Sequence, residues 1–319
     1  MIEDVAYRVT MQVRHPSVVR FGYMLETDTF KRADAFLKNW VELGKGGLAF
    51  SAPSRMGKTY AIRKLYGSLK AAFSHIACVS ITAETESRTD RFSRTYSELL
   101  QQLKKDDPTR LRSKNCDVFA GHLMSLCRDS DALYCVVFLD EAQKFNEQQW
   151  NALYIALNRL ESNGVGMLVY SFGNEELGNR GKLLVESGNQ GIGGRFFVRM
   201  MSFEGVRTKD ELRTLLKQYD EALHFPDPHW PYTRYFARAK YDHDNWRLEF
   251  ESDAYWSALC EYAGVHEGGP RRSGFCMQWI TDPIHFVLKD CLTSEAKGKR
   301  NESVAWVQAI EQTCPHQIY

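Results

Sequence analysis

SAPSRMGKTYAI, residues 51–62, is the most informative segment of this sequence. It matches the phosphate-binding pattern G-x-x-x-x-G-K-[ST] at its last three positions, but Ala52 stands where the first glycine is expected. In such a loop small residues let backbone N–H groups surround phosphates, the lysine reaches their outer oxygens, and the hydroxyl binds Mg²⁺. Alanine is small enough for the turn unless the position needs a positive φ. The candidate nucleotide-binding residues are therefore Ala52, Pro53, Ser54, Arg55, Met56, Gly57, Lys58, Thr59 and Tyr60.

The flanks of this loop predict a strand before it and a helix after it. An apolar run precedes the loop, and apolar residues at helical spacing follow it from Ala61 to Ala72. Similar short apolar runs recur with helical patterns between them, which is typical of a parallel sheet covered on both faces. We therefore expect an α/β fold. The predicted strands are residues 47–51, 75–81, 135–140, 165–172 and 196–200.

A second motif, CVVFLDEAQKF at residues 135–145, completes a hydrolytic site. Its apolar strand ends at Asp140, which can hold Mg²⁺, and Glu141 follows as the candidate base for an attacking water. An acidic turn after a strand is common by itself, but this one follows the lysine-containing loop with one further predicted strand between them. That extra strand argues against small-molecule kinases and GTPases. Together the two motifs predict ATP hydrolysis with Mg²⁺ at Thr59 and Asp140.

Five further residues, at three places in the sequence, are candidates for sensing the γ-phosphate. Ser171 or Asn174 follows the next strand and can orient the water, and an ordinary strand-end turn is the alternative. Arg195, directly before the fifth predicted strand, can act as an arginine finger toward a neighbouring subunit, or it is a solvated surface residue. Arg271 and Arg272 begin a later helical stretch, where an arginine can bind the γ-phosphate.

Overall charge and cysteine content exclude several classes of protein. The chain has 41 basic and 40 acidic side chains, a net charge of +1, so no whole-protein field indicates a nucleic-acid or membrane partner. None of the eight cysteines has zinc-site spacing, so we expect reduced thiols. No signal peptide or membrane-spanning run is evident, and we expect a cytoplasmic protein. Locally, residues 88–114 hold eight basic against four acidic side chains.

The strand pattern stops near residue 205, which predicts two domains and a tail. We assign residues 1–205 to an N-terminal segment plus the nucleotide-binding core. Residues 206–290 form a helical lid, with predicted helices at 208–223, 251–263 and 272–289, and residues 302–312 form another helix. An aromatic-rich insertion occupies 224–250. Residues 291–319 are the tail, which can dock a partner or close the lid.

These elements in this order resemble the AAA+ ATPases: Walker A at 52–59, Walker B at 136–141, sensor one at 171–174, an arginine finger at 195 and sensor two at 268–271. Within that group, LDEAQKF, FGNEEL and GGPRR are similar to the TnsC/TniB family, which regulates target selection in Tn-seven-like and CRISPR-associated transposons. Ala52 and the long insertion depart from that family.

The resemblance implies ATP-dependent assembly on double-stranded DNA without sequence preference. It implies a ring or helical filament with six to seven subunits per turn, linking a TniQ-like target-recognition adaptor to a transposase in the bacterial cytoplasm, with hydrolysis resetting the assembly. The basic stretch would contact phosphates. The residues expected to do so are Arg88, Lys104, Lys105, Arg112 and Lys114. A helicase loader of the IstB/DnaC type and a signalling or secretion ATPase that does not act on DNA are the alternatives.

Overall fold

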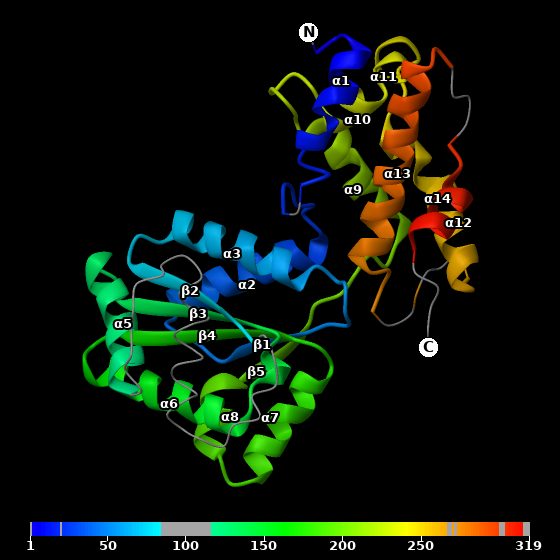
Figure 1. The fold of residues 1–319 in the computed structure, drawn as a ribbon. Coiled ribbons are helices and arrows are strands. Elements are labelled where there is room, and N and C mark those ends of the chain that lie inside the picture. The colour runs from blue at the N-terminus through cyan, green and yellow to red at the C-terminus, as the bar shows by residue number, and fades with distance from the viewer. Residues whose placement is uncertain are drawn as a thin grey trace. The chain divides into compact units, whose positions relative to one another are not determined.

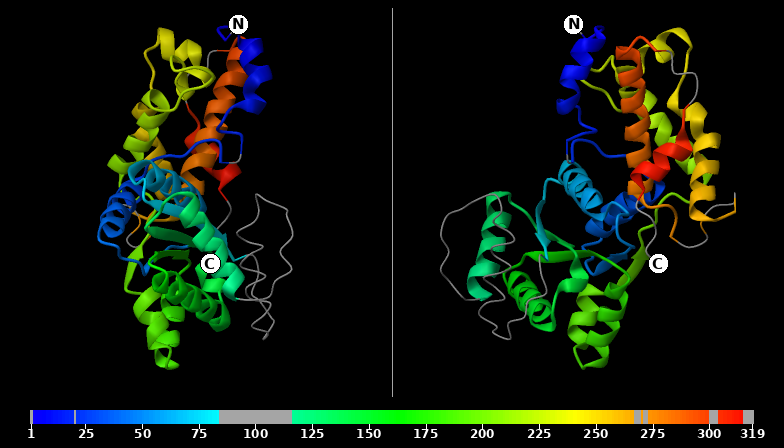
Figure 2. Two further views of the ribbon diagram at one scale, coloured as in Figure 1. Left: turned by 90° about the vertical axis from the view of Figure 1, so that its left-hand side faces the viewer. Right: turned by 45° about the vertical axis from the view of Figure 1, so that its right-hand side comes forward.

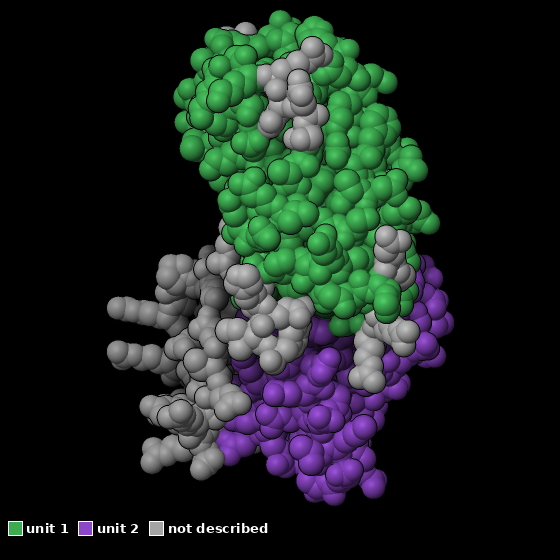
Figure 3. All heavy atoms as spheres, turned by 90° about the vertical axis from the view of Figure 1, so that its right-hand side faces the viewer, with its two compact units in different colours: residues 1–29, 55–57, 204–319 green, residues 30–54, 58–203 purple. Residues whose placement is uncertain are grey.

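The computed structural model describes residues 2–19, 21–83, 116–266, 270, 273–299 and 304–314. They divide into two compact units (Figure 3). The nucleotide-binding motifs lie mainly in one, comprising residues 30–54 and 58–203, which we call the core unit. The other comprises residues 1–29, 55–57 and 204–319, and we call it the helical unit.

The core unit is a parallel sheet between helices, which confirms the predicted fold class (Figures 1 and 2). Within the described residues the sheet has five strands in the order β2-β3-β4-β1-β5, and every neighbouring pair is parallel. Helices α2 and α3 cover one face, while α5, α6, α7 and α8 cover the other. The strands are β1 (Leu48–Ser51), β2 (Ile76–Thr82), β3 (Tyr134–Asp140), β4 (Gly166–Gly173) and β5 (Arg199–Ser202). The helices are α2 (Asp28–Glu42), α3 (Lys58–Ala72), α5 (Cys116–Asp129), η2 (Ala142–Lys144), α6 (Glu147–Ser162), α7 (Glu176–Glu186) and α8 (Gln190–Phe196).

Burial on both faces explains why these strands read as apolar runs. All of β3 after its first residue is buried, and so is all of β4 after its first. Because the strands are parallel, β1, β3 and β4 end at the same edge of the sheet. The segments that follow them, at residues 52, 141 and 174, are thereby brought to one edge. Strand β3 does not neighbour β1, since β4 lies between them, as the extra strand in the sequence predicted.

The fifth strand begins later than we predicted. Instead of residues 196–200, β5 spans Arg199–Ser202, and Phe196 is the last residue of α8. The two phenylalanines that suggested a strand serve a different purpose, because Phe196 and Phe197 pack around Trp150 on the helical layer. The apolar run therefore marked a packing site beside the sheet.

The helical unit joins the N-terminal segment to the C-terminal helices. Arg8 is fully buried, donates from Nη1 to the carbonyl of Tyr235 at 2.7 Å and pairs with Glu295. His15 is enclosed by four aromatic rings, including those of Phe225 and Tyr232. Burial, with a smaller effect of His285, lowers the pKa of His15 to about 3. Residues 1–29, for which we expected an N-terminal segment preceding the core, group with the C-terminal helices in the helical unit.

Two helices predicted at 208–223 and 251–263 lie close to those observed, Lys209–Glu221 and Ser252–Ala263. The long helix spans Met277–Ala296 and not 272–289, so it crosses the predicted start of the tail at residue 291, and the last helix starts at Trp306 and not at 302. The insertion at 224–250 is part of the unit's hydrophobic core, through Trp230, Tyr235 and Leu248. The elements are α1 (Val5–Met11), η1 (Gln12–Arg14), α9 (Lys209–Glu221), α10 (Tyr232–Phe236), α11 (Arg238–His243), η3 (Leu248–Glu251), α12 (Ser252–Ala263), α13 (Met277–Ala296) and α14 (Trp306–Thr313).

Two findings concern the cellular compartment that we expected from the sequence. The cysteines whose side chains are described are free thiols, and all but Cys276 are buried. Among the helices in the described ranges, none combines the length and the apolar character that crossing a membrane requires.

Candidate nucleotide-binding site

Ala52 fits the loop between β1 and α3, because the loop adopts the left-handed backbone conformation at other residues. The left-handed conformation occurs at Arg55, with φ of 66°, and at Gly57, with φ of 86°, but not at Ala52. Ala52 is 1% exposed, and its N–H donates to the carbonyl of Gly173 at 3.0 Å. Since this position does not use the conformation that favours glycine, the extra Cβ causes no backbone strain.

Lys58 begins α3 and directs its ammonium group back toward the loop. Its Nζ donates to the carbonyl oxygens of Ala52 at 3.0 Å and Pro53 at 2.9 Å. Burial lowers the pKa of Lys58, while the nearby carboxylates of Glu141 and Asp140 oppose that effect. The loop thus keeps a largely buried cation beside the backbone that would surround a phosphate.

Thr59 connects the loop with β3. Its Oγ1 donates to Oδ2 of Asp140 at 2.7 Å, and Oδ1 of Asp140 accepts from the N–H of Glu141 at 2.9 Å. Asp140 is 3% exposed, so burial raises its pKa, and the Thr59 hydroxyl partly opposes the rise. A hydroxyl beside a buried carboxylate is the pair of hard oxygen ligands that Mg²⁺ takes together with phosphates. These two residues therefore fit the expected metal.

Glu141 follows β3 in an unusual conformation. Its backbone is left-handed, with φ of 54° and ψ of 37°, which is uncommon for a residue other than glycine and is found at functional sites. Its Oε2 accepts from Nε2 of Gln143 at 3.0 Å and from Nζ of Lys144 at 3.2 Å. Burial alone would raise the pKa of Glu141, but these two donors outweigh it and the pKa is lowered. The carboxylate is therefore ionised and held in place.

Comparison with known proteins identifies the fold of the core unit. Residues 41–180, from the end of α2 into α7, match the family described as AAA domain. The fold is that of an AAA+ P-loop NTPase. The structure is similar to the ORC2 protein of Aeropyrum pernix in its ADPNP-ADP complexes, with a TM-score of 0.57 and 14% identity over 93% of this chain and 71% of that chain. The ADP form gives 0.53 and 15%, over 90% and 67%. No curated protein sequence matches this chain.

Of the two candidate sensors in this AAA+ core, Asn174 lies at the end of β4 and Ser171 does not. Ser171 is fully buried inside the strand, paired in register with Ala49, and its hydroxyl has no hydrogen-bond partner within the described residues. It has no exposed surface through which to contact a phosphate. Asn174 already uses its side chain, because Oδ1 accepts from the N–H of Glu176 at the start of α7.

Arg195 lies on the surface of the AAA+ core, in the last turn of α8. Its Nη1 pairs with Oε1 of Glu161 at 2.8 Å, and both side chains are exposed to solvent, by 47% and 38%. An exposed pair of this kind contributes at most about 1 kcal/mol and opens easily. Arg195 is therefore available to a partner on the surface rather than committed to its own chain.

The remaining predicted residues lie outside the described part of the chain. These are the sensor-two candidates Arg271 and Arg272, and the DNA-contact candidates Arg88, Lys104, Lys105, Arg112 and Lys114. Their expected roles stay predictions.

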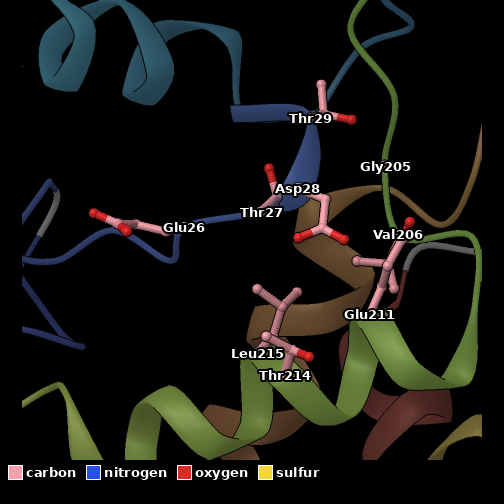
Figure 4. A pocket seen from close by; sticks show the side chains of 9 residues that line it. All are labelled: Glu26, Thr27, Asp28, Thr29, Gly205, Val206, Glu211, Thr214 and Leu215. Carbon is pink, nitrogen blue, oxygen red and sulfur yellow. The ribbon is translucent and has the colours of Figure 1, made fainter. Parts of the chain in front are cut away.

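Two cavities formed by described residues include none of the nucleotide motifs. One, lined by residues 26–29, 205–206 and the start of α9, measures about 10 Å³ and has room for a single water (Figure 4). A larger one of about 450 Å³ lies between α11 and the end of α13. Both are lined by residues of the helical unit and by none of the motifs that carry nucleotide chemistry.

Sequence reasoning missed Gln143. It is 6% exposed and contacts both Glu141 and the end of β4. The only signal is its place two residues after Glu141, in a segment that we read as the continuation of a motif.

Proposed function

We propose that this protein is an ATP-hydrolysing regulator of DNA transposition that assembles on double-stranded DNA. The observation that carries the enzymatic part is the hydrogen bond of 2.7 Å between Thr59 and Asp140. It joins two motifs that lie 81 residues apart in sequence, and each supplies one part of a nucleotide site. A hydroxyl and a carboxylate so placed, beside the Lys58 ammonium, match the requirements for binding a Mg²⁺-nucleotide.

Each residue of the site has a distinct task in this proposal. Lys58 would give up its two loop carbonyls for phosphate oxygens, and Thr59 and Asp140 would hold Mg²⁺. Mg²⁺ held there would supply positive charge to offset that of the phosphates. Glu141, ionised and anchored, would accept a proton from the attacking water. ATP is the proposed nucleotide, and similarity to the Aeropyrum pernix ORC2 protein, whose structures are of ADPNP-ADP complexes and of an ADP form, supports it.

Assembly and transposition rest on the resemblance of the sequence motifs to TnsC/TniB proteins. We propose a ring or filament of six to seven subunits per turn around DNA, in which Arg195 reaches the nucleotide of the next subunit. The exposed position of Arg195 supports that role. A transposase and a TniQ-like adaptor are the proposed partners. We place the protein in the bacterial cytoplasm, and the free thiols of the described cysteines support a reducing compartment.

Electron microscopy of the full chain tests assembly directly. With a slowly hydrolysed ATP analogue, Mg²⁺ and duplex DNA, we expect rings or filaments, and with ADP we expect none. Lys58→Ala is the control, since it removes the phosphate-binding cation and should abolish assembly in every condition. Monomers of the unmodified protein in the presence of the analogue and DNA would overturn the proposal.

A second measurement tests the contact with DNA. Changing Lys104 and Lys105 together to Ala should weaken DNA binding and flatten its dependence on salt, because fewer counterions are released. An unchanged slope would remove this basic stretch from the proposed interface.

A further inference from the structure

Gln143 uses both ends of its side-chain amide, and the two partners fix its orientation. Nε2 donates to the Glu141 carboxylate at 3.0 Å, and Oε1 accepts from the backbone N–H of Asn174 at 3.2 Å. A carboxylate can only accept here and a backbone N–H can only donate, so the amide has one possible orientation. The side chain therefore links the proposed base on β3 to the turn after β4.

Gly173 leaves room for the Gln143 side chain, and Arg180 holds the backbone of Gln143. A Cβ on Gly173 would lie 2.7 Å from Oε1 of Gln143, so glycine at that position is what lets the amide approach. The guanidinium of Arg180, on α7, donates from Nη2 to the backbone carbonyl of Gln143 at 3.0 Å. Because Gln143 is held through its side chain and its backbone, it has little freedom to reorient.

The same turn also holds the start of the phosphate loop. The carbonyl of Gly173 accepts from the N–H of Ala52 at 3.0 Å, and the carbonyl of Asn174 accepts from Oγ of Ser51 at 3.1 Å. Residues 173–174 thus contact the loop on one side and Gln143 on the other. A continuous chain of hydrogen bonds runs from the loop, through this turn and Gln143, to the Glu141 carboxylate.

We propose that Gln143 is a positioning residue for hydrolysis, which holds the Glu141 carboxylate at a fixed position relative to the phosphate loop. The inference rests on the proposed ATPase function. Without Gln143, the Glu141 carboxylate would keep Lys144 as its one partner among the described side chains, and that partly exposed ammonium is a weak restraint. Hydrolysis depends on the base lying at the right place, and a shift of about 1 Å can reduce a rate about 100-fold.

Two variants of Gln143 separate its two contacts. Gln143→Ala removes both, and we expect kcat for ATP to fall about 10- to 100-fold while nucleotide affinity stays within about twofold. Gln143→Glu keeps an acceptor for Asn174 but loses the donor to Glu141, so kcat should fall here too. Lys144→Ala is the matched comparison, because it removes the other donor to Glu141 without touching the turn, and its kcat should fall less than that of Gln143→Ala because the Lys144 ammonium is partly exposed.

Hydrogen exchange of the nucleotide-free protein gives a readout that does not depend on activity. Deuterium uptake of a peptide covering residues 173–177 should speed up in Gln143→Ala, because the Asn174 N–H loses its acceptor. It should remain near the unmodified rate in Gln143→Glu and in Lys144→Ala. Thermal unfolding of each variant shows that the chain is folded before kcat is compared.

The outcomes distinguish this inference from the function on which it rests. If the unmodified protein neither binds nor hydrolyses ATP, the proposed function is overturned, and the positioning role with it. If the unmodified protein hydrolyses ATP and Gln143→Ala does so at the same kcat, only the role of Gln143 is overturned. A loss of affinity equal to the loss of kcat/KM, with kcat unchanged, would also contradict it, because that pattern marks ground-state binding.

Discussion

Thr59→Ala removes the hydroxyl that joins the phosphate loop to β3. Asp140 then keeps one described hydrogen bond, from the N–H of Glu141, while its carboxylate remains 3% exposed. Leaving a buried acceptor without its donor costs about 1–3 kcal/mol, and bonds to charged groups lie in the upper part of that range. We therefore expect the free energy of unfolding to fall by about 2 kcal/mol at neutral pH.

This loss should depend on pH because Asp140 titrates differently in the folded and unfolded chain. Burial raises the folded pKa of Asp140 above its ordinary value of 3.8, and losing Thr59 removes an effect that opposes the rise. The folded state then holds its proton more tightly than the unfolded state, so stability is greatest below 3.8 and is lost as pH rises through the folded pKa. The destabilisation by Thr59→Ala should therefore be larger at about pH 8 than at about pH 5.

Urea unfolding of the nucleotide-free chain, followed by tryptophan fluorescence, measures both effects. Thr59→Ser is the matched control, since it keeps the hydroxyl and should lose less than about 0.5 kcal/mol. In the same preparations, Mg²⁺-dependent binding of ATP should weaken for Thr59→Ala and persist for Thr59→Ser. Equal stability of the alanine and serine variants at both pH values would refute the reasoning, because it would mean that the hydroxyl is not bonded to a buried carboxylate.

Three more predictions concern the N-terminal segment, the phosphate loop and the surface of the core unit. Arg8→Ala should lower the unfolding free energy by about 3–5 kcal/mol because Glu295 loses its buried partner, and a loss below about 1 kcal/mol in urea would contradict the packing of the N-terminal segment. Ala52→Gly should leave ATP affinity and turnover within about twofold, because residue 52 is not left-handed; a tenfold change in either constant would show that alanine tunes the loop. Arg195→Ala should cost under about 1 kcal/mol of stability, since its pair with Glu161 is exposed, yet reduce turnover of the assembled protein about 10³-fold, and unchanged turnover would exclude an arginine finger there.

The sequence predicted those parts of the fold that burial on both sides of the sheet makes apolar. Strands β1 to β4 are such runs, and the motifs at their ends predicted that Lys58, Thr59 and Asp140 lie together. The edge strand β5 was misplaced because most of it is exposed, so it lacks an apolar run. Helix α8 was missed for a related reason, since its sequence QGIGGRF is rich in glycine, a poor helix former. Packing explains one of those glycines, because a Cβ at Gly193 would lie 2.2 Å from Val185.

The other features that the sequence did not predict depend on contacts between residues far apart in the chain. Arg8 and Tyr235 lie 227 residues apart in sequence, so neither residue alone predicts that the N-terminal segment joins the C-terminal helices. Gln143 was missed because its role depends on a hydrogen bond from the N–H of Asn174, which follows a different strand and is 31 residues away in sequence. Ser171 was favoured equally with Asn174 because a strand's final residue cannot be placed to within two positions from an apolar pattern, and the strand continues to Gly173.

The proposed ATPase is tested most directly by measuring ATP binding and phosphate release for the unmodified protein and for Glu141→Gln. The amide keeps the size of the side chain but cannot accept a proton, so nucleotide affinity should stay within about twofold while turnover falls at least about 100-fold. Rings or filaments formed with ATP and DNA should then persist. Turnover of Glu141→Gln at the rate of the unmodified protein would contradict the account.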